Sequence, residues 1–328
     1  MGNIFRWGII GPGSIAHKFA TGLRALDDAQ IVAVGSRSQD RADAFADAYD
    51  VPNRHASYEA LAEDPEVDAV YVATPHPFHK ENSILCLKAG KPVLCEKPFT
   101  INQHEAIEVI EVARSEGVFL MEAMWTRFLP ITQQVKAWVT DGAIGEVRML
   151  YADFGFRARI NPKGRLFDLA LGGGGLLDIG IYPISYASMI FDAQPATISS
   201  QAHIGETGVD EQAAIVFGYD KGQLALISCG VRIKTPHEAK ILGTDGIITV
   251  PKFWDGRTAI LSTGDKEEEV TLECAGNGYE CEAAEVARCV REGKLESDLM
   301  SHDDTLANMQ TLDAIREQWG LKYPMERK

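Results

Sequence analysis

A lysine, an aspartate and a tyrosine stand in settings that suit acid–base chemistry. Lys97 lies in "CEKP" at the end of a predicted strand, and Asp178 and Tyr182 lie four residues apart in "GGGGLLDIGIYP". If that second segment is helical, its carboxylate and phenol share one face, one turn apart. A free phenol has a pKa of about 10, and a nearby ammonium group lowers it, which makes the phenol a better base. A buried structural hydrogen-bond pair is the plainer interpretation of Asp178 and Tyr182.

A glycine-rich turn near the start of the chain has the pattern of a phosphate-binding loop. Gly11, Gly13 and Ala16 follow the apolar segment "IFRWGII" and open a segment with helical spacing. The first glycine allows a tight turn, and the second allows the backbone to approach a pyrophosphate. The N-terminus of the helix, with Ser14 and Ile15 in its first turn, attracts negative charge. The pattern predicts a dinucleotide-binding site.

The residues after the next predicted strand bear on which dinucleotide binds. An acidic residue there would accept a hydrogen bond from the ribose 2′-hydroxyl of NAD. The chain instead has Ser36, Arg37 and Ser38, and a guanidinium with two hydroxyls suits a 2′-phosphate. Asp40 remains a possible ribose partner, and Arg37 could also be a solvated surface residue. We expect NADP, with NAD the less favoured cofactor.

The elements that would position these residues change in character along the chain. Up to about residue 122, strand-like and helix-like segments alternate, which predicts a parallel, doubly wound sheet. One of these helices is expected to start at Thr100, with Gln103 completing a capping box. From about residue 196 to 272, short strands are separated by turns such as "DKG" and "TDG", which are hairpin signals. Ser301 is expected to cap the last helix.

This pattern predicts two domains and an α/β fold. Residues 1–122 are expected to form an NADP-binding Rossmann domain. Residues 123–328 are expected to form an α+β domain with a large, mostly antiparallel, open-faced sheet for substrate binding and oligomerisation.

Composition limits the partners and the location. The formal charge of −15 argues against nucleic acid or an anionic membrane as a partner. The longest apolar runs look far shorter than a bilayer span. Six scattered cysteines and an N-terminus that leads directly into a strand suggest a cytoplasmic protein with reduced thiols. His76 and His79 lack further ligands at metal-binding spacing, so no metal site is expected.

Three motifs together resemble those of the Gfo/Idh/MocA oxidoreductases. The segments "WGIIGPGSIA", "AGKPVLCEKP" and "GGGGLLDIGIYP" occur in the order and at the separations of that family. "MEAMWTRFLP" and Tyr182 are similar to the branch of dimeric dihydrodiol dehydrogenases and NADP-dependent D-xylose dehydrogenases. Most members of the family have histidine at the position of Tyr182.

The resemblance implies roles for individual residues. Lys97 and Tyr182 would flank the nicotinamide ring, Asp178 would help to hold the substrate, and the Lys97–Pro98 bond would be cis. It further implies that the glycines let the helix with Asp178 start close to the substrate and cofactor. The expected cofactor-binding residues are Gly11, Gly13, Ser14, Ile15, Ser36, Arg37, Thr74, Pro75, His79, Glu96 and Lys97.

Substrate specificity is expected to depend on aromatic residues outside the first domain. Aromatic faces suit the apolar side of a pyranose or of a cyclohexadiene diol, although each ring could equally be part of the core. The expected substrate-binding residues are Trp125, Arg127, Phe128, Phe154, Asp178 and Trp254.

The function predicted from these features is an NADP-dependent dehydrogenase acting on a cyclic polyol, either an aldose such as D-xylose or a trans-dihydrodiol. Two alternatives remain: a non-catalytic NADP sensor on the same fold, and a reductase of a dicarbonyl or anhydroketose. The apolar strands "AAIVFGY" and "QLALISCGV" offer more apolar positions than one layer of helices covers, which predicts a homodimer through the second domain's sheet.

Overall fold

The protein, described here by a computed structural model for residues 4–326, forms two compact units. The first unit contains Met1–Trp125 and Cys274–Leu306, and the second contains Thr126–Glu273 and Ala307–Lys328. The predicted division after residue 122 lies close to the first crossing between the units. The predicted division was wrong for residues 274–306, which pack with the first unit. Helix α8 (Tyr279–Arg291) packs on α1 (Ser14–Leu23) so closely that a Cβ on Gly22 would lie 3.2 Å from the Glu280 amide nitrogen.

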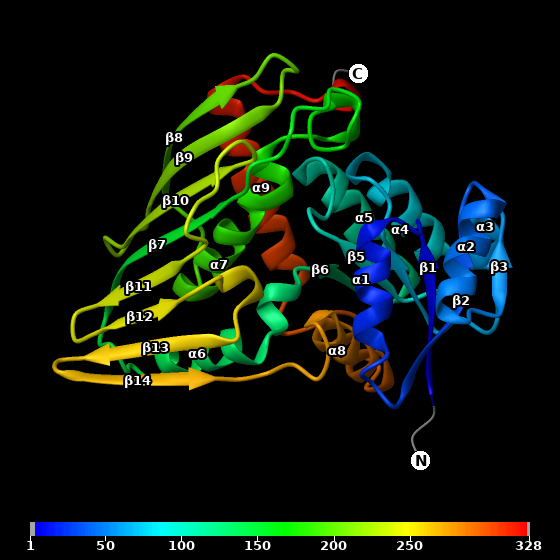
Figure 1. Ribbon diagram of the computed structural model, residues 1–328, viewed down its shortest axis with the longest axis horizontal. Helices are drawn as coiled ribbons and strands as arrows, with labels where there is room; N and C mark the ends of the chain where they lie inside the picture. Colours follow the sequence, from blue (N-terminus) through cyan, green and yellow to red (C-terminus); the bar gives the residue numbers. More distant parts are fainter. Residues whose placement is uncertain (1–3, 327–328) are drawn as a thin grey trace. The chain divides into compact units, whose positions relative to one another are not determined.

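The first unit is built on a six-stranded sheet in which every pairing is parallel. The strand order β3-β2-β1-β4-β5-β6 is that of a Rossmann fold, which confirms the predicted doubly wound sheet (Figure 1). The strands are β1 (Phe5–Ile10), β2 (Ala29–Gly35), β3 (Asn53–His55), β4 (Ala69–Val72), β5 (Val93–Glu96) and β6 (Leu120–Ala123).

Helices between these strands pack their apolar sides on the sheet. Besides α1 they are α2 (Gln39–Tyr49), α3 (Tyr58–Ala62), η1 (His76–Phe78), α4 (His79–Lys88) and α5 (Gln103–Glu116). The capping box predicted at Thr100 was wrong. Asn102 caps α5 instead, because its side chain, directly before the first turn, accepts a hydrogen bond from the Glu105 amide at 2.9 Å.

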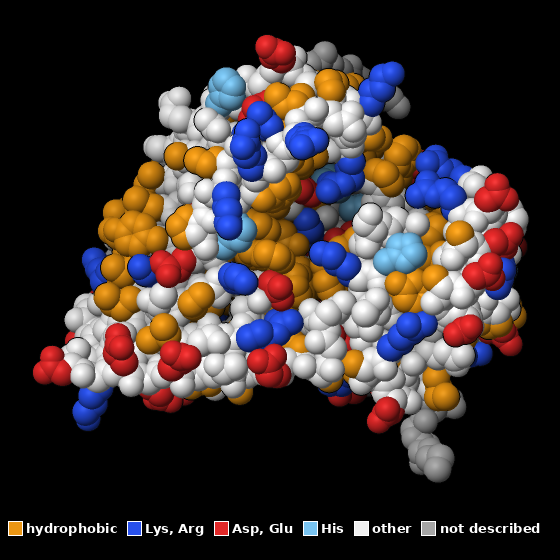
Figure 2. Space-filling view, viewed as in Figure 1, with side chains coloured by type: hydrophobic (Ala, Val, Ile, Leu, Met, Phe, Trp, Pro, Cys, Tyr) orange, Lys and Arg blue, Asp and Glu red, His pale blue; other side chains and the backbone are white. Residues whose placement is uncertain are grey.

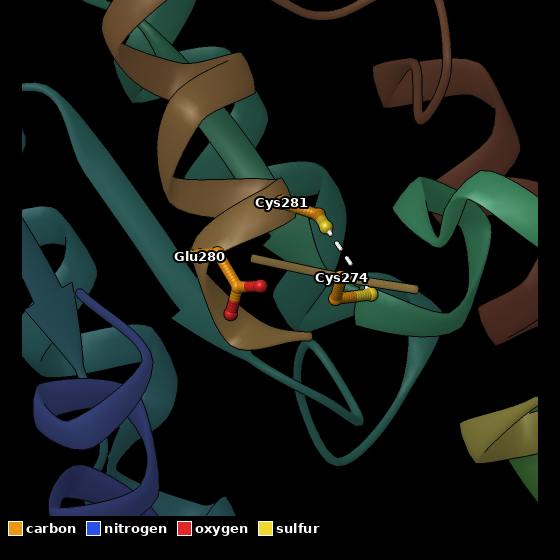
Figure 3. A group of neighbouring side chains, drawn as sticks. All are labelled: Cys274, Glu280 and Cys281. Carbon is orange, nitrogen blue, oxygen red and sulfur yellow. Dashed lines mark hydrogen bonds between the residues drawn. The ribbon is translucent and has the colours of Figure 1, made fainter. Parts of the chain in front are cut away.

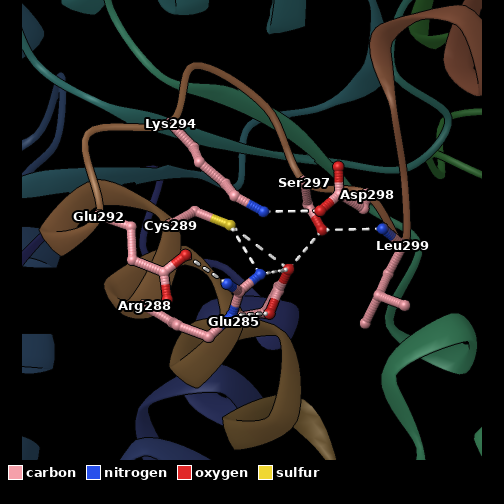
Figure 4. A network of polar contacts seen from close by, with 8 residues as sticks. All are labelled: Glu285, Arg288, Cys289, Glu292, Lys294, Ser297, Asp298 and Leu299. Atoms are coloured by element: carbon pink, nitrogen blue, oxygen red, sulfur yellow. Dashed lines mark hydrogen bonds and ion pairs between the residues drawn. The ribbon is translucent and has the colours of Figure 1, made fainter.

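A polar network ties the loop after α8 to the helix (Figure 4). Glu285 is the centre of this network: its carboxylate accepts hydrogen bonds from the Arg288 guanidinium at 2.7 and 2.9 Å and from the Ser297 hydroxyl at 2.5 Å. These charge-assisted bonds lower the pKa of Glu285 against the opposing effect of burial. The network therefore helps to keep residues 292–299 on the first unit.

The second unit is built on an eight-stranded sheet with the order β14-β13-β12-β11-β7-β10-β9-β8. All pairings are antiparallel except that of β7 with β10, and the hairpins predicted at "DKG" and "TDG" join β9 to β10 and β11 to β12. The strands are β7 (Val147–Gly155), β8 (Thr197–Ile204), β9 (Asp210–Gly218), β10 (Leu224–Gly230), β11 (Ala239–Gly243), β12 (Ile247–Val250), β13 (Thr258–Thr263) and β14 (Lys266–Thr271).

Helix α7 forms the core of this unit together with one face of the sheet. The run Leu169–Phe191 is long and apolar enough to cross a membrane by length and composition, which corrects the expectation that no run reaches that length. This run is a core helix, because 94% of its most apolar stretch of 18 residues is buried inside the structure. The helices of this unit are η2 (Trp125–Phe128), α6 (Pro130–Thr140), η3 (Leu169–Leu171), η4 (Leu176–Gly180), α7 (Ile181–Phe191), η5 (Phe253–Asp255) and η6 (Pro324–Glu326).

The last helix, α9 (His302–Trp319), begins in the first unit and ends in the second. Its predicted cap is confirmed: the Ser301 hydroxyl accepts from the Asp304 amide at 3.0 Å, and the Asp304 carboxylate accepts from the Ser301 amide at 3.1 Å.

The outer face of the eight-stranded sheet has a row of exposed apolar side chains. Leu226 of β10 pairs with Val216 of β9 on one side and with Tyr151 of β7 on the other. These three side chains are 36%, 42% and 40% exposed, while their strand neighbours alternate into the core. Hydrophobic side chains gather at the left of the space-filling view, over this sheet (Figure 2). The open-faced sheet predicted from the sequence is therefore present.

Candidate active site

The loop after β1 leaves room for a ligand next to its backbone. Gly11 has a φ of +84°, which favours glycine, and a Cβ there would lie 3.0 Å from the Ala73 carbonyl oxygen. A Cβ on Gly13, by contrast, would meet only the Gly11 carbonyl oxygen, at 4.0 Å. Ser14 and Ile15 follow in the first turn of α1, where the backbone N–H groups lack intrahelical acceptors. This geometry fits the pyrophosphate of a dinucleotide.

The end of β2 opens on a pocket of about 490 Å³ within the first unit. Arg37 is exposed and its guanidinium carbon lies 5.3 Å from the centre of the Phe78 ring, so the cation lies over the aromatic face. Ser36 is buried, and its hydroxyl accepts a hydrogen bond from the Ser38 amide at 3.2 Å. The lining residues are Arg37, Ala56, Ser57, Tyr58, Glu59, Thr74, Pro75, Phe78, Glu81, Asn82 and Leu85. Of the expected cofactor residues, Arg37, Thr74 and Pro75 thus face one cavity.

His79 connects two loops of the first unit. Its Nε2 lies 2.7 Å from the Thr74 carbonyl oxygen and its Nδ1 lies 2.9 Å from that of Pro98. Burial lowers the pKa of His79 to about 4, although the backbone hydrogen bonds act in the opposite direction. The ring is 1% exposed, and in its neutral form it can donate to only one of these two carbonyl oxygens. We expect His79 to hold these loops in place, with Thr74 and Pro75 nearer to the cofactor.

Glu96 and Lys97 stand at the carboxyl end of β5, where ligands bind in such sheets. The Tyr71 hydroxyl donates to one Glu96 oxygen, and the Lys97 amide donates to the other at 3.1 Å. Lys97 itself is half-buried, and its bond to Pro98 is cis, as predicted. Glu282 of α8 is fully buried and acts electrostatically on both Tyr71 and Glu96, and burial raises its pKa well above the ordinary value. The backbone that carries Lys97 is thus fixed by a buried network.

The glycine run from residue 172 to 175 accommodates a buried carboxylate. A Cβ on Gly174, which has a φ of +122°, would lie 2.1 Å from Asp210 Oδ1. The other oxygen of Asp210 accepts a hydrogen bond from the Leu176 amide at 2.6 Å. Burial raises the pKa of Asp210 to about 7, although the backbone hydrogen bonds and Arg316 lower it. The close approach of this helix to substrate and cofactor stays a prediction, and the structure adds a second reason for glycine at positions 174 and 175, which is the space that Asp210 fills.

Asp178 and Tyr182 lie across a change in helical geometry. Leu176–Gly180 forms a π-helical turn, and α7 begins at Ile181. Single π turns within helices are frequent at functional sites. Both residues are 6% exposed, taken over backbone and side chain together. The Arg165 guanidinium donates to Asp178 Oδ1 at 2.8 Å, a contact that the sequence analysis missed because Arg165 comes from the irregular segment before η3.

The Tyr182 ring lies against an aromatic cluster of the second unit. Phe154 and Trp254 stack at a centroid distance of 4.6 Å and an interplanar angle of 10°. The centre of the Tyr182 ring lies 5.4 Å from that of Phe154 and 6.4 Å from that of Trp254, and both contacts are edge-to-face. His237, which the sequence analysis missed, lies 5.0 Å from Phe154, and its Nδ1 accepts a hydrogen bond from the Trp254 indole at 3.4 Å. The predicted substrate residues Phe154 and Trp254 are thus brought together with Tyr182.

The remaining predicted substrate residues are tied into the protein. Trp125 stacks on Tyr279 at 4.5 Å within the first unit. Arg127 is 4% exposed and donates to the hydroxyl and carbonyl oxygens of Ser185, at 3.0 and 3.3 Å. Phe128 is 6% exposed. Burial alone does not separate a core role from a substrate contact, because Phe154 and Tyr182 are also 6% exposed, so the substrate roles of these residues stay predictions.

Comparisons with known proteins agree with both halves of this description. Residues 5–124 match the model of an oxidoreductase family with an NAD-binding Rossmann fold, GFO_IDH_MocA, and residues 132–249 match the GFO/IDH/MocA C-terminal domain. The chain belongs to the Gfo/Idh/MocA oxidoreductase family. The resemblance identified from the three motifs is therefore confirmed.

Relatives within the Gfo/Idh/MocA family cover nearly the whole chain. Trans-1,2-dihydrobenzene-1,2-diol dehydrogenase from Mus musculus is 38% identical, over 98% of this chain and 99% of its own. The enzyme of the same name from Danio rerio is 39% identical, over 98% of each chain. Among solved structures, the 3-ketoreductase KijD10 from Actinomadura kijaniata, in complex with NADP and TDP-benzene, is 27% identical, with a TM-score of 0.85 over 96% of this chain and 98% of its own. The protein is accordingly an oxidoreductase with a Rossmann NAD(P)-binding domain.

Proposed function

We propose that the protein is an NADP-dependent dehydrogenase that oxidises a cyclic polyol, either an aldose such as D-xylose or a trans-dihydrodiol. The observation that carries this proposal is the setting of Tyr182: a phenol against an aromatic cluster, in the same helical segment as a carboxylate held by an arginine. The names of the full-length relatives, which are diol dehydrogenases, support the same class of substrate.

A bound nicotinamide nucleotide would supply the hydride acceptor. Tyr182 Oη takes the proton from the hydroxyl of the carbon that is oxidised. The family resemblance assigns to Lys97 the positive charge that favours a phenolate. Asp178, held by Arg165, accepts a hydrogen bond from a second hydroxyl and so orients the substrate. The stacked rings of Phe154 and Trp254 offer an apolar face to the ring of the substrate.

The choice of NADP rests on Arg37 and the two serines beside it. Arg37 lines the pocket of the first unit and carries a cation that pairs with a 2′-phosphate. Glu59 and Glu81 line the same pocket, and their negative charges repel the 2′-phosphate, so the preference for NADP depends on Arg37 outweighing them. The guanidinium favours NADP because a bidentate contact to phosphate is short and direct.

A panel of substrates tests the proposal. Purified protein is offered NADP or NAD with a series of aldoses and trans-dihydrodiols, and formation of the reduced nicotinamide is followed by its absorbance. We expect turnover with members of at least one of these classes and higher kcat/KM with NADP. Binding of NADP without turnover of any compound, in either direction, would favour the alternative of a non-catalytic NADP sensor. Turnover only in the direction of reduction, with a dicarbonyl or anhydroketose, would favour the reductase.

A further inference from the structure

Two cysteines and a glutamate gather at the start of α8, at a place that the oxidoreductase chemistry does not use. Cys274, Glu280 and Cys281 each offer a ligand atom, and these atoms all lie within 4.8 Å of one another. Figure 3 shows the two sulfur atoms facing each other, with the Glu280 carboxylate beside them. The expectation of no metal site came from the sequence, where no set of cysteines or carboxylates at ligand spacing accompanies His76 and His79.

The distance between the sulfur atoms suits a tetrahedral metal ion. Sγ of Cys281 lies 3.8 Å from Sγ of Cys274. A zinc ion bonds to each thiolate at about 2.3 Å, and a tetrahedral angle between two such bonds places the sulfurs about 3.8 Å apart. The existing arrangement therefore needs little movement of the sulfur atoms to bind the ion.

The carboxylate is held in place before any ion binds. Glu280 is 2% exposed, and its two oxygens accept hydrogen bonds from the Gly276 and Gly278 amides at 2.6 and 2.8 Å. Each carboxylate oxygen has a second lone pair, so these bonds leave it able to coordinate a metal. Hydrogen bonds of this kind orient ligating carboxylates in metal sites. The loop is anchored further by Asn277, whose amide donates to the Lys18 carbonyl of α1 at 2.9 Å.

The donor atoms of the cluster suit a soft cation. Zinc binds cysteine as the thiolate, so it would displace the thiol protons as it binds. Thiolate ligands select a soft ion such as Zn²⁺ over Mg²⁺ or Ca²⁺. Both cysteines are partly exposed, which leaves access for the ion and for a water molecule as fourth ligand.

We propose that Cys274, Glu280 and Cys281 form a zinc-binding site. Cys274 directly follows Glu273, the last residue of the second unit before the chain re-enters the first unit. A zinc ion here would connect this entry point to the first turn of α8 and stabilise the loop between them. The proposal is independent of the proposed function, since it involves none of the residues assigned to catalysis or cofactor binding.

Zinc binding to the full-length, untagged protein tests this directly. The protein is treated with a chelator and a reductant, and Zn²⁺ is then added in a calorimetric titration. We expect one zinc ion per chain with a Kd in the micromolar range or below, and a higher Tm with zinc. Co²⁺ in place of zinc should give a thiolate-to-cobalt charge-transfer absorption. Cys274→Ser and Cys281→Ser should each weaken zinc binding at least about tenfold and abolish that absorption.

Glu273→Gln is a matched control, because it removes an exposed carboxylate next to Cys274 and should leave zinc affinity unchanged. Glu280→Gln should weaken binding, and its Tm without zinc shows whether the loop itself is disturbed. Failure to bind zinc, or zinc binding that survives both cysteine variants, would overturn the proposal. A Cys274–Cys281 disulfide formed without any retained zinc would overturn it as well, in favour of a redox-active pair.

Discussion

Arg165 donates to Asp178 Oδ1 at 2.8 Å, and the two residues differ greatly in exposure: the arginine side chain is 47% exposed and the aspartate side chain 9%. One partner is thus fixed in the core of the second unit while the other reaches solvent. The arginine hydrogen-bonds to one carboxylate oxygen, and Tyr182 follows four residues later, just after the π-helical turn that contains Asp178.

We predict that Arg165→Gln lowers kcat/KM about 10- to 100-fold, mainly through a higher KM for the polyol. The change removes the guanidinium hydrogen bond that helps to orient the Asp178 carboxylate toward a substrate hydroxyl. Steady-state kinetics and a separate titration with NADP check this, and the Kd for NADP should not change. Arg159→Gln is the control, because Arg159 is an exposed arginine of the same loop region. Equal losses in both variants would mean that the loop, rather than the ion pair, matters.

The sequence could predict the local motifs of this site but not the partners that hold them. Gly11, Lys97 and Tyr182 lie in short segments whose pattern depends only on neighbouring residues. Arg165 comes from an irregular segment, and Asp210 lies 34 residues from the Leu176 amide to which it binds. Such pairings depend on how the sheet folds over the helix, which periodicity does not specify.

The same limit applies to the fold. The alternation of strands and helices predicts the six-stranded sheet, because each βα unit is local. The return of residues 274–306 to the first unit was missed, because Gly22 and the amide of Glu280 come together only through tertiary packing. The cap of α5 was misplaced by two residues, since Thr100 and Asn102 are both good capping residues.

We predict that Arg37→Ala erodes the preference for NADP while leaving turnover with NAD largely intact. Loss of a charge-assisted bond to the 2′-phosphate should lower the ratio of kcat/KM for NADP to that for NAD by about 10- to 100-fold. Arg114→Ala, which removes another partly exposed arginine of the first unit, should leave the ratio unchanged. A wild-type enzyme that prefers NAD would contradict the role given to Arg37.

We predict that the protein is a homodimer that buries the outer face of the eight-stranded sheet. Leu226→Lys places a charge in the row formed with Val216 and Tyr151, so it should shift the protein to monomers in light scattering. Ile107→Lys alters an exposed apolar residue of α5 and should leave the mass unchanged. A wild-type monomer at micromolar concentration would rule this interface out.

We predict that Asp210 makes the second unit less stable as the pH rises from about 4 to about 7. Burial raises the pKa of Asp210 to about 7 from the ordinary value of 3.8, so the folded state holds its proton over this range while the unfolded state loses it. Asp210 makes its full contribution to the free energy of unfolding below the pKa of the unfolded state. As the pH rises to the pKa of the folded state, the free energy of unfolding falls by roughly 4 kcal/mol.

Urea unfolding at about pH 5 and about pH 8 measures this effect as the difference between the wild type and Asp210→Asn. The variant cannot ionise at this position, so its stability should change less between the two pH values. An identical pH dependence in both proteins would show that the pKa of Asp210 is the same in the folded and the unfolded state.

The central claim is that Tyr182 accepts the proton of the substrate, and the most direct measurement is kcat of Tyr182→Phe per folded molecule. The change keeps the ring against Phe154 and Trp254 and removes only the hydroxyl. Tyr186→Phe is the matched control: Tyr186 lies one turn further along α7, is 2% exposed, and its hydroxyl has no hydrogen-bond partner among residues 4–326.

General base catalysis contributes about 10²–10⁴ in rate, so kcat of Tyr182→Phe should fall by that factor. NADP affinity and Tm should stay close to those of the wild type, and Tyr186→Phe should keep full activity. The contrary result is a lower Tm for Tyr182→Phe with nearly intact turnover per folded molecule. That result would make Tyr182 a structural residue and leave Lys97 as the group that moves the proton.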